Sequence, residues 1–318
     1  MKKQSFNKRQ NRIAFVISVF LISFCVLNPA FSQESEGNSY KAFMQKNPFL
    51  TTELYINNFD LIKGKVVKTT RESYDIDENG HKGFGDSDCP CVSYFYYQFN
   101  DEGLLESKYY LLKETTGKVL FKRKWQYSYS KGKYTVIMND YKREEETKLA
   151  YKVSIKDDVM TLYCKNAKAR QEETITVSKG STIINEQRGD WDPTKREYIY
   201  SDDSCSTKFY VNDNLLRTMN FYRGKETTYV QEKYQETGKF VSIIDFNAEY
   251  TEGLSKSQVF VDGELSEESI NSSITRKYSS AGFVEYESRK PYNQTVGSYS
   301  ESRIEILDSL DDIINQEF

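Results

Sequence analysis

Hydrophobic and polar residues alternate along most of this chain from Ile62 onward. In the stretch 148–156, every second side chain is apolar: Leu149, Tyr151, Val153 and Ile155. A period of two places one face of a strand on a core and the other face in water. The pattern therefore predicts β-strands as the main element of the fold.

The same alternation recurs along the chain, and short polar turns separate the segments. Similar stretches are 65–74, 92–99, 104–112, 118–129, 134–141, 159–164, 173–178, 181–186, 196–200, 207–211, 215–222, 227–234, 239–246, 257–261, 273–278 and 283–289. The connectors are rich in Gly, Asn and Asp, as in Asn100-Asp101-Glu102-Gly103, Lys131-Gly132, Asp157-Asp158, Lys179-Gly180, Arg223-Gly224 and Asp262-Gly263. Turns of this kind join neighbouring antiparallel strands. We predict an all-β fold over residues 62–302, an antiparallel meander of hairpins that forms an extended twisted or partly closed sheet.

Two segments depart from the alternation. Residues 39–58 have mixed periodicity, so we assign residues 33–61 to a lead-in that is either a short helix or irregular. Near the other end, apolar residues recur at helical spacing, namely Ile306, Leu310, Ile313 and Ile314. This spacing predicts a short helix within residues 303–318.

The beginning of the chain has the three-part layout of a secretory signal. Five basic residues precede an apolar run of 15 residues, Ile13–Leu27, and the small-residue pattern Ala30-Phe31-Ser32 follows. We predict that residues 1–32 are removed and that the protein is exported to the periplasm or the cell surface. The alternative is an uncleaved anchor, but a helix needs about 20 apolar residues to span a bilayer.

Charge and composition limit the classes of partner that this protein is expected to bind. Without the five basic residues of the leader, 39 of the 44 basic residues remain against 47 acidic ones. Nucleic acid and anionic lipid both reward clustered Lys and Arg, so the acidic balance argues against them. No glycine-rich phosphate loop follows a strand and opens a helix, so nucleotide binding has no support. All 25 tyrosines lie beyond the leader, and Tyr suits a half-buried strand surface.

A membrane-spanning barrel is a rival for an exported, alternating chain. Its strands need about 9–11 residues with an uncharged face toward lipid. In the stretch 118–129, Lys122 and Lys124 share one face and Arg123 interrupts the other. We therefore expect that the chain is not an integral membrane protein.

One loop has the ligand spacing of a calcium site. Asp75, Asp77 and Asn79 occupy positions one, three and five, Gly80 is sixth, and Asp86 is twelfth. Oxygen ligands at these positions, with glycine at the sharp turn, are what a calcium loop requires. Asp86 replaces the usual Glu, however, and Asp, Asn and Gly are also the ordinary residues of a solvated turn. We therefore keep both readings, with calcium as the only candidate cofactor.

Four cysteines remain after the leader: Cys89, Cys91, Cys164 and Cys205. An even count in an oxidising compartment favours disulfides. Because a proline separates Cys89 from Cys91, we expect at least one of them to reach Cys164 or Cys205. A bridge between Cys164 and Cys205 would close a loop of about 41 residues and contribute about 4 kcal/mol. Zinc held by four thiolates and unbridged thiols are the alternatives.

Catalysis has little support in the sequence. His81 is the only histidine, and it lies in the Asp- and Gly-rich loop, where a solvated role is expected. No serine lies in a motif that resembles a nucleophile elbow. We therefore predict no catalytic residue, although a pair of carboxylates among the 47 acids could serve a hydrolase.

A weak repeat accompanies the turns. In each unit an aromatic residue ends one strand, a glycine follows four residues later, and aliphatic residues begin the next strand. The units begin at Phe99, Tyr234 and Tyr278, with Gly103, Gly238 and Gly282 in the turns, and a glycine-less relative spans 210–216. Glycine reaches a left-handed turn conformation at little cost. Over residues 62–290 this pattern resembles the YD-repeat (Rhs-type) β-hairpin units of exported bacterial proteins. The resemblance implies an extended β-meander and export.

These observations favour a non-catalytic exported β-repeat protein that acts as a binding or structural component of the cell envelope. Exposed tyrosines on a sheet face would offer contact area for an envelope protein or glycan. The rivals are a secreted hydrolase with a carboxylate pair, and a calcium-stabilised surface binding protein or toxin-associated partner.

Overall fold

The computed structural model describes most of the chain beyond the lead-in. The described residues are 59–84, 88–101, 103, 105–130, 133–157, 159–167, 170–178, 180–201, 204–222, 227–235, 238–280 and 283–318. The predicted leader, residues 1–32, and the lead-in up to residue 58 lie outside them.

Within the described residues, nineteen strands lie between a short 3₁₀ helix and a short α-helix. The elements are η2 (Phe59–Ile62), β1 (Val66–Ile76), β2 (Lys82–Gly83), β3 (Cys91–Phe99), β4 (Leu105–Glu114), β5 (Val119–Ser130), β6 (Lys133–Asp140), β7 (Glu145–Lys156), β8 (Val159–Asn166), β9 (Gln171–Ser178), β10 (Ser181–Arg188), β11 (Thr194–Tyr200), β12 (Ser204–Val211), β13 (Asn214–Tyr222), β14 (Thr227–Gln235), β15 (Gly238–Phe246), β16 (Glu252–Val261), β17 (Glu264–Tyr278), β18 (Val284–Pro291), β19 (Gly297–Leu307) and α3 (Asp312–Glu317).

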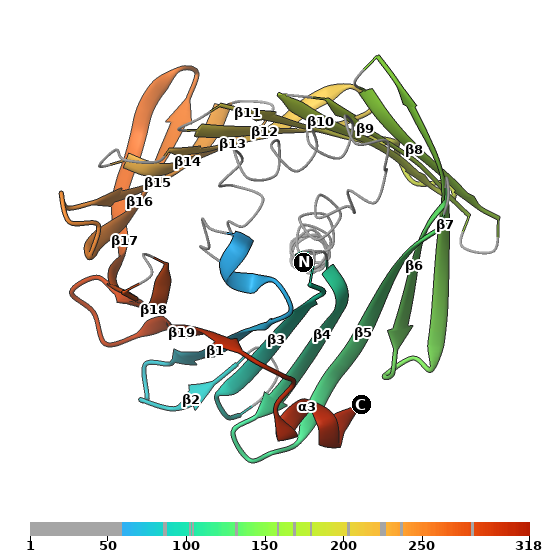
Figure 1. Cartoon of the computed structure of the whole chain (residues 1–318). Helices are drawn as coiled ribbons and strands as arrows, with labels where there is room; N and C mark the ends of the chain where they lie inside the picture. Colours follow the sequence, from blue (N-terminus) through green and yellow to red (C-terminus); the bar gives the residue numbers. More distant parts are fainter. Residues whose placement is uncertain are drawn as a thin grey trace.

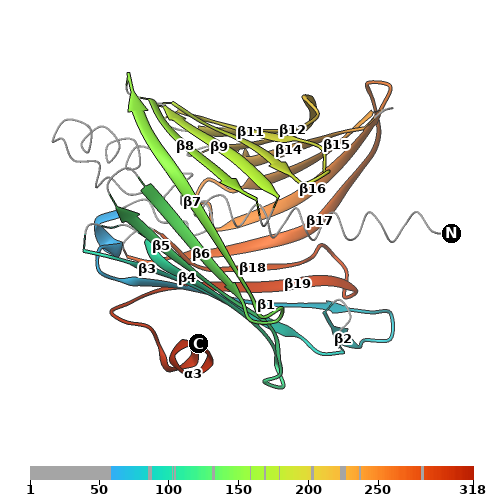
Figure 2. The same cartoon turned by 90° about the vertical axis from the view of Figure 1, so that its right-hand side faces the viewer.

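The strands close into a barrel (Figures 1 and 2). From β3 to β19 each strand pairs antiparallel with the next, and β1 pairs with both β3 and β19. The short β2 pairs with the end of β1 and stays outside the ring, which has 18 strands. The predictions of an all-β antiparallel meander and a short C-terminal helix are confirmed, but the expected extended or partly closed sheet is wrong, because the ring closes fully. Closure leaves no unpaired edge strand in the ring.

The tight turns follow from local sequence. Asn212 and Asp213 between β12 and β13 both have positive φ, at 48° and 62°. Asp262 and Gly263 between β16 and β17 have φ of 51° and 86°. Two successive residues of positive φ make the hairpin turn whose twist matches that of antiparallel strands, and Asn, Asp and Gly adopt it most easily.

Two short helices identify the faces of the barrel wall. Helix α3 lies outside the ring (Figure 2), where its Ile314 packs with Val66 and Tyr96. Helix η2 lies inside the ring (Figure 1), where its Ile62 packs with Val67 and Tyr97. Successive residues of a strand face opposite sides, and register partners share a side. The strand registers therefore extend this assignment around the ring and define an outer face and a lumen face.

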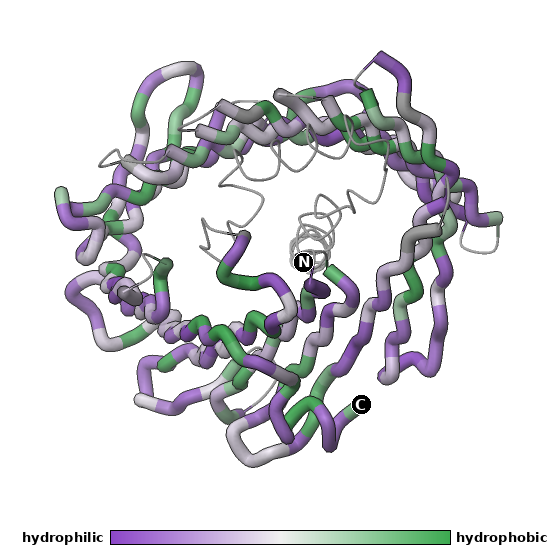
Figure 3. The backbone as a smooth tube through the Cα atoms, viewed as in Figure 1, coloured by the Kyte–Doolittle hydropathy of each residue, from purple (hydrophilic) through white to green (hydrophobic). Residues whose placement is uncertain are grey.

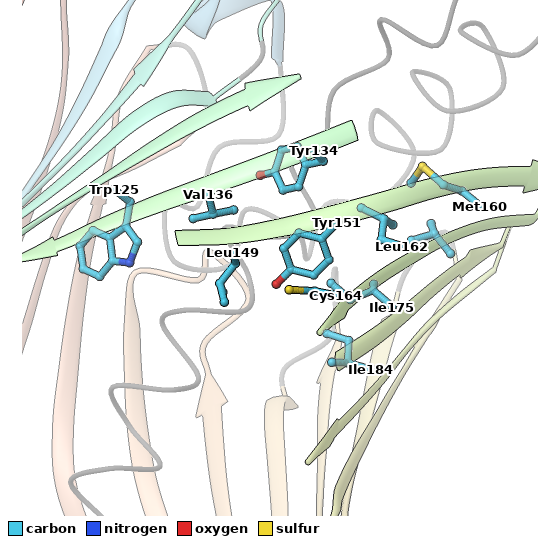
Figure 4. Close-up of a cluster of buried hydrophobic side chains, with 11 residues drawn as sticks. Trp125, Tyr134, Val136, Leu149, Tyr151, Met160, Leu162, Cys164, Ile175 and Ile184 are labelled. Atoms are coloured by element: carbon cyan, nitrogen blue, oxygen red, sulfur yellow. The ribbon is translucent and has the colours of Figure 1, made fainter. Parts of the chain in front are cut away.

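Most of the apolar core lies on the lumen face. Figure 4 shows its largest cluster, which spans β5 to β10. Its buried members are Trp125, Tyr134, Val136, Leu149, Tyr151, Met160, Leu162, Cys164, Ile175, Val177 and Ile184. The tube in Figure 3 alternates between hydrophilic and hydrophobic colours along the strands, as the sequence pattern predicted. The outer face of the same strands is polar, with exposed Lys148, Lys152 and Glu172.

The end of the chain differs in detail from the expected helix over residues 303–318. Strand β19 continues to Leu307, and α3 comprises only Asp312–Glu317. Ile304 and Ile306 are two residues apart and both pack on the lumen side with Val67. A spacing of two residues on one face is that of a strand, so these two residues extend β19 and do not start the helix.

Candidate binding site on the lumen wall

A group of buried polar side chains interrupts the apolar lumen wall at β9 and β10. Glu173 on β9 is the register partner of Glu186 on β10. The Glu173 side chain is nearly fully buried, and its Oε2 accepts hydrogen bonds from Tyr151 Oη at 3.2 Å and Gln171 Nε2 at 3.1 Å. Its Oε1 has no hydrogen-bond partner among the described residues. A buried carboxylate with an unsatisfied oxygen is costly to keep, so this group is a candidate for binding.

Two arginines lie beside the second carboxylate, that of Glu186, and offset its charge. Glu186 accepts hydrogen bonds from Gln171 Nε2 at 3.1 Å and from Arg188 Nε. Arg196 Nη2 on β11 lies 3.9 Å from the other oxygen of Glu186. The wall at β9 to β11 therefore holds two acids and two arginines in neighbouring positions.

A row of cations and rings continues along the lumen wall. The registers place Arg196, Phe209, Arg217, Lys233 and Phe240 side by side on β11 to β15. The guanidinium carbons of Arg196 and Arg217 lie 5.6 and 5.7 Å from the centre of the Phe209 ring. Lys233 Nζ lies 6.0 Å from the centre of the Phe240 ring. We call these five residues the cation row.

Elsewhere on the lumen wall, buried charges have partners within the wall. Lys108 on β4 is 1% exposed, and its Nζ lies 4.8 Å from the Tyr97 ring centre and 5.5 Å from that of Trp125. Arg123 on β5 forms an ion pair with the buried Asp140 on β6. The rings stabilise the Lys108 charge and Asp140 neutralises Arg123, which fits a structural role, although Arg123 Nε has no hydrogen-bond partner among the described residues.

A groove at the barrel rim is a weaker candidate. It has a volume of about 1290 Å³ and is lined by parts of β15 to β18 and by residues 291–296. Asp245, one of the two acids that line it, forms an ion pair with Lys256 at 2.8 Å. No lining side chain of this groove has a buried polar atom without a partner.

The predicted calcium loop forms a turn held by Asp77. Asp77 Oδ1 accepts hydrogen bonds from the backbone N–H groups of Asn79 at 2.8 Å and His81 at 2.9 Å. The bond from the His81 amide is the main cause that lowers the pKa of Asp77 below its usual value. Asp75 accepts a hydrogen bond from Ser298 Oγ instead. Asp86 lies outside the described residues, so calcium binding here stays a prediction.

The expected bridge from Cys89 or Cys91 to Cys164 or Cys205 is absent, and so is a bridge between Cys164 and Cys205: the structure holds all four cysteines as thiols. Cys164 on β8 and Cys205 on β12 are separated by three intervening strands. At a spacing of about 4.8 Å per strand they lie roughly 19 Å apart along the wall, whereas a disulfide requires Cα atoms within about 7 Å. In the part of the chain that the structure describes, no group of three or more His, Cys, Asp and Glu is arranged to hold a metal ion.

His81 lies in the turn with its side chain 80% exposed, and its Nδ1 is 3.2 Å from Asp77 Oδ2. The sequence reasoning missed the cation row. It identified the strands that carry these residues but did not work out which positions face inward. The available signal was the phase of the alternation: Arg196, Arg217 and Lys233 all occupy positions in phase with apolar lumen residues.

Comparisons with known proteins give structural likeness only. No family model matches the chain, and no curated protein matches its sequence. A porin-like protein from Bacteroides uniformis is 10% identical with a TM-score of 0.27, over 75% of this chain and 95% of the other. Transferrin-binding protein B from Haemophilus parasuis is 5% identical with a TM-score of 0.16, over 76% of each chain. The class of the protein, an 18-stranded closed antiparallel barrel, therefore comes from its own strand pairing.

The resemblance to YD-repeat proteins is wrong. No family model of any kind matches, and the aromatic–glycine units are hairpin connections within one closed ring. The unit at Phe99 has the expected turn, since Gly103 has a φ of 83°, but Gly238 has no positive φ. The shared pattern reflects hairpin chemistry, which many β-proteins use.

The expectation that the chain is not an integral membrane protein also fails. It rested on the charged side chains of Lys122, Arg123 and Lys124 in the stretch 118–129 and did not anticipate that the ring closes with 18 strands. Closed antiparallel barrels with an even number of strands are the form in which β-proteins cross outer membranes. The outer face of β5 to β10, with exposed Lys148, Lys152 and Glu172, is polar and does not form the apolar band that contact with lipid requires. Among the described residues, no helix is long and apolar enough to cross a membrane.

Proposed function

We propose that this protein is a non-catalytic β-barrel of the cell envelope, associated with the outer membrane, and that its lumen wall binds a small polar solute. The observation that carries the proposal is closure: β1 pairs with β19 along all eleven of its residues, so the two ends of the meander form one ring. Barrels of 16–18 strands enclose a lumen wide enough for solutes. The predicted leader of residues 1–32 supports export.

The chemistry of the lumen wall supports binding over catalysis. Its polar groups include the acid pair Glu173 and Glu186 and the cations Arg196, Arg217 and Lys233, set among apolar and aromatic side chains. Binding sites for small molecules combine apolar lining with a few placed polar groups, as this wall does.

Cell fractionation tests the location. The full chain, expressed in a host with an outer membrane, is expected in the outer-membrane fraction as a species whose gel mobility changes on heating. The matched control lacks residues 2–32 and should remain in the cytoplasm. Alkaline extraction then separates an integrated barrel from one bound to the membrane surface. Quantitative recovery of the exported chain in the soluble periplasmic fraction would contradict the proposal.

A further inference from the structure

The lumen positions of β11 to β15 carry cations without acids. The inward side chains include Arg196, Arg217 and Lys233, while the carboxylates of this region, such as Glu197 and Glu232, occupy outward positions. We propose that the cation row is a binding site for the carboxylate or phosphate group of a small organic anion. This inference specifies the ligand of the proposed function. It rests on that function in one respect, namely that the lumen wall is the face that binds.

Unsatisfied donors are the first support for an anion. Arg217 Nε and Arg196 Nη1 are both buried and have no hydrogen-bond partner among the described residues. A buried N–H without an acceptor loses its hydration and gains nothing in return. The planar fork of a guanidinium fits carboxylate and phosphate oxygens, so a bound oxyanion would satisfy these donors.

The charge balance is the second support. Neither Arg217 nor Lys233 forms an ion pair with a carboxylate of the described residues, and Arg196 reaches Glu186 only at 3.9 Å. Glu186 is also shared with Arg188, so it does not neutralise the row. The side chains of Arg196, Arg217 and Lys233 are partly buried. Neighbouring cations repel each other, and a ligand anion would remove that repulsion.

The aromatic rings beside the cations indicate the chemical character of the rest of the ligand. Phe209 lies between the two arginines and Phe240 lies beside Lys233. Phe221 and Tyr229 pack against each other nearby, with ring centres 5.0 Å apart. This apolar surface beside the cations fits a ligand with an aromatic or aliphatic body, so benzoate is a better match than acetate.

Calorimetry on the purified full chain tests the site with three probes: sodium benzoate, sodium acetate and inorganic phosphate, each against sodium chloride at equal ionic strength. We expect saturable binding of benzoate or phosphate, and benzoate should bind more tightly than acetate. Preference for benzoate identifies a carboxylate ligand with an apolar body, and preference for phosphate identifies a phosphorylated one. Both outcomes support the site.

Two variants and a control locate the binding. Arg217→Gln and Lys233→Gln should each weaken binding about tenfold or more, since each removes a charged donor. Lys208→Gln is the matched control, because Lys208 lies on β12 beside the row but faces outward, opposite Glu197 on β11. It should change affinity less than twofold. If no probe binds at 10 mM, or if all three variants lose affinity equally, the anion site is overturned. A negative result in purified protein leaves the envelope location untouched.

Discussion

At the scale of single residues, close packing of neighbouring strands decides which side chains the barrel tolerates. Gly238 begins β15, and a Cβ built on it would lie 2.0 Å from the carbonyl oxygen of Phe260 on β16. From the sequence we expected Gly238 to provide a left-handed turn, as Gly103 does. Its role is instead to let two backbones approach, which depends on a partner strand that local sequence does not reveal.

Gly238→Ala should therefore destabilise the barrel by about 1–3 kcal/mol, because β15 or β16 must shift to make room for the methyl group. Gly263→Asn is the control. Gly263 lies in a turn with a φ of 86°, and nothing lies within 4 Å of a Cβ placed there. Asn tolerates that conformation, so this change should cost less than about 0.5 kcal/mol. Urea unfolding measures both, and equal stability of Gly238→Ala and the unchanged protein would refute the packing argument.

At the scale of elements, the sequence predicted strands and turns well because they depend on neighbouring residues. The terminal helix was found from its spacing, but its start was placed too early, since Ile304 and Ile306 also fit a strand.

What the sequence did not show is how α3 attaches to the wall. Asp311 caps α3, accepting hydrogen bonds from the N–H groups of Ile313 and Ile314. The same carboxylate accepts hydrogen bonds from Tyr96 Oη at 2.8 Å and lies 2.8 Å from Lys68 Nζ.

Asp311→Ala should loosen α3 from the outer face and cost about 1–2 kcal/mol, because a cap and a charge-assisted contact are lost together. Burial alone would raise the pKa of Asp311, but the hydrogen bonds from Lys68 and Tyr96 outweigh it and lower the pKa below its usual value. A lowered pKa means that the stabilisation is complete above the usual carboxylate pKa of about 4 and declines as the pH falls through the folded value.

Hydrogen exchange of the α3 amides, followed over a pH series, measures this effect. The difference between the unchanged protein and Asp311→Ala should be constant near neutral pH and shrink in acid. Asp312→Ala, which alters an exposed acid in the same turn, serves as the control. A difference that stays constant down to pH 2 would show that the carboxylate charge is not what holds α3.

At the scale of the whole molecule, closure and the lumen site both depend on contacts between distant parts of the chain. The register of β1 against β19 joins Val66 to Leu307, and no periodicity or turn motif near either strand specifies it. Arg217 points inward only because the ring is closed, since an open sheet encloses no lumen. The sequence therefore predicted the meander but left its closure, and with it the candidate site, undetermined.

Closure can be tested directly with a cysteine pair across the last seam. Ser73 on β1 is the register partner of Ser300 on β19, and opposite Cα atoms of antiparallel strands lie about 4.5–5.5 Å apart, within the reach of a disulfide. The double variant Ser73→Cys, Ser300→Cys should form a bridge under mild oxidation, detected by peptide mapping under non-reducing conditions. Ser73→Cys with Ser242→Cys is the control, because Ser242 lies on β15, which pairs with β14 and β16. Closure predicts a bridge in the first pair and none in the second. If neither pair bridges in folded protein, the sheet is open at this seam, and the envelope barrel and its lumen site would both have to be abandoned.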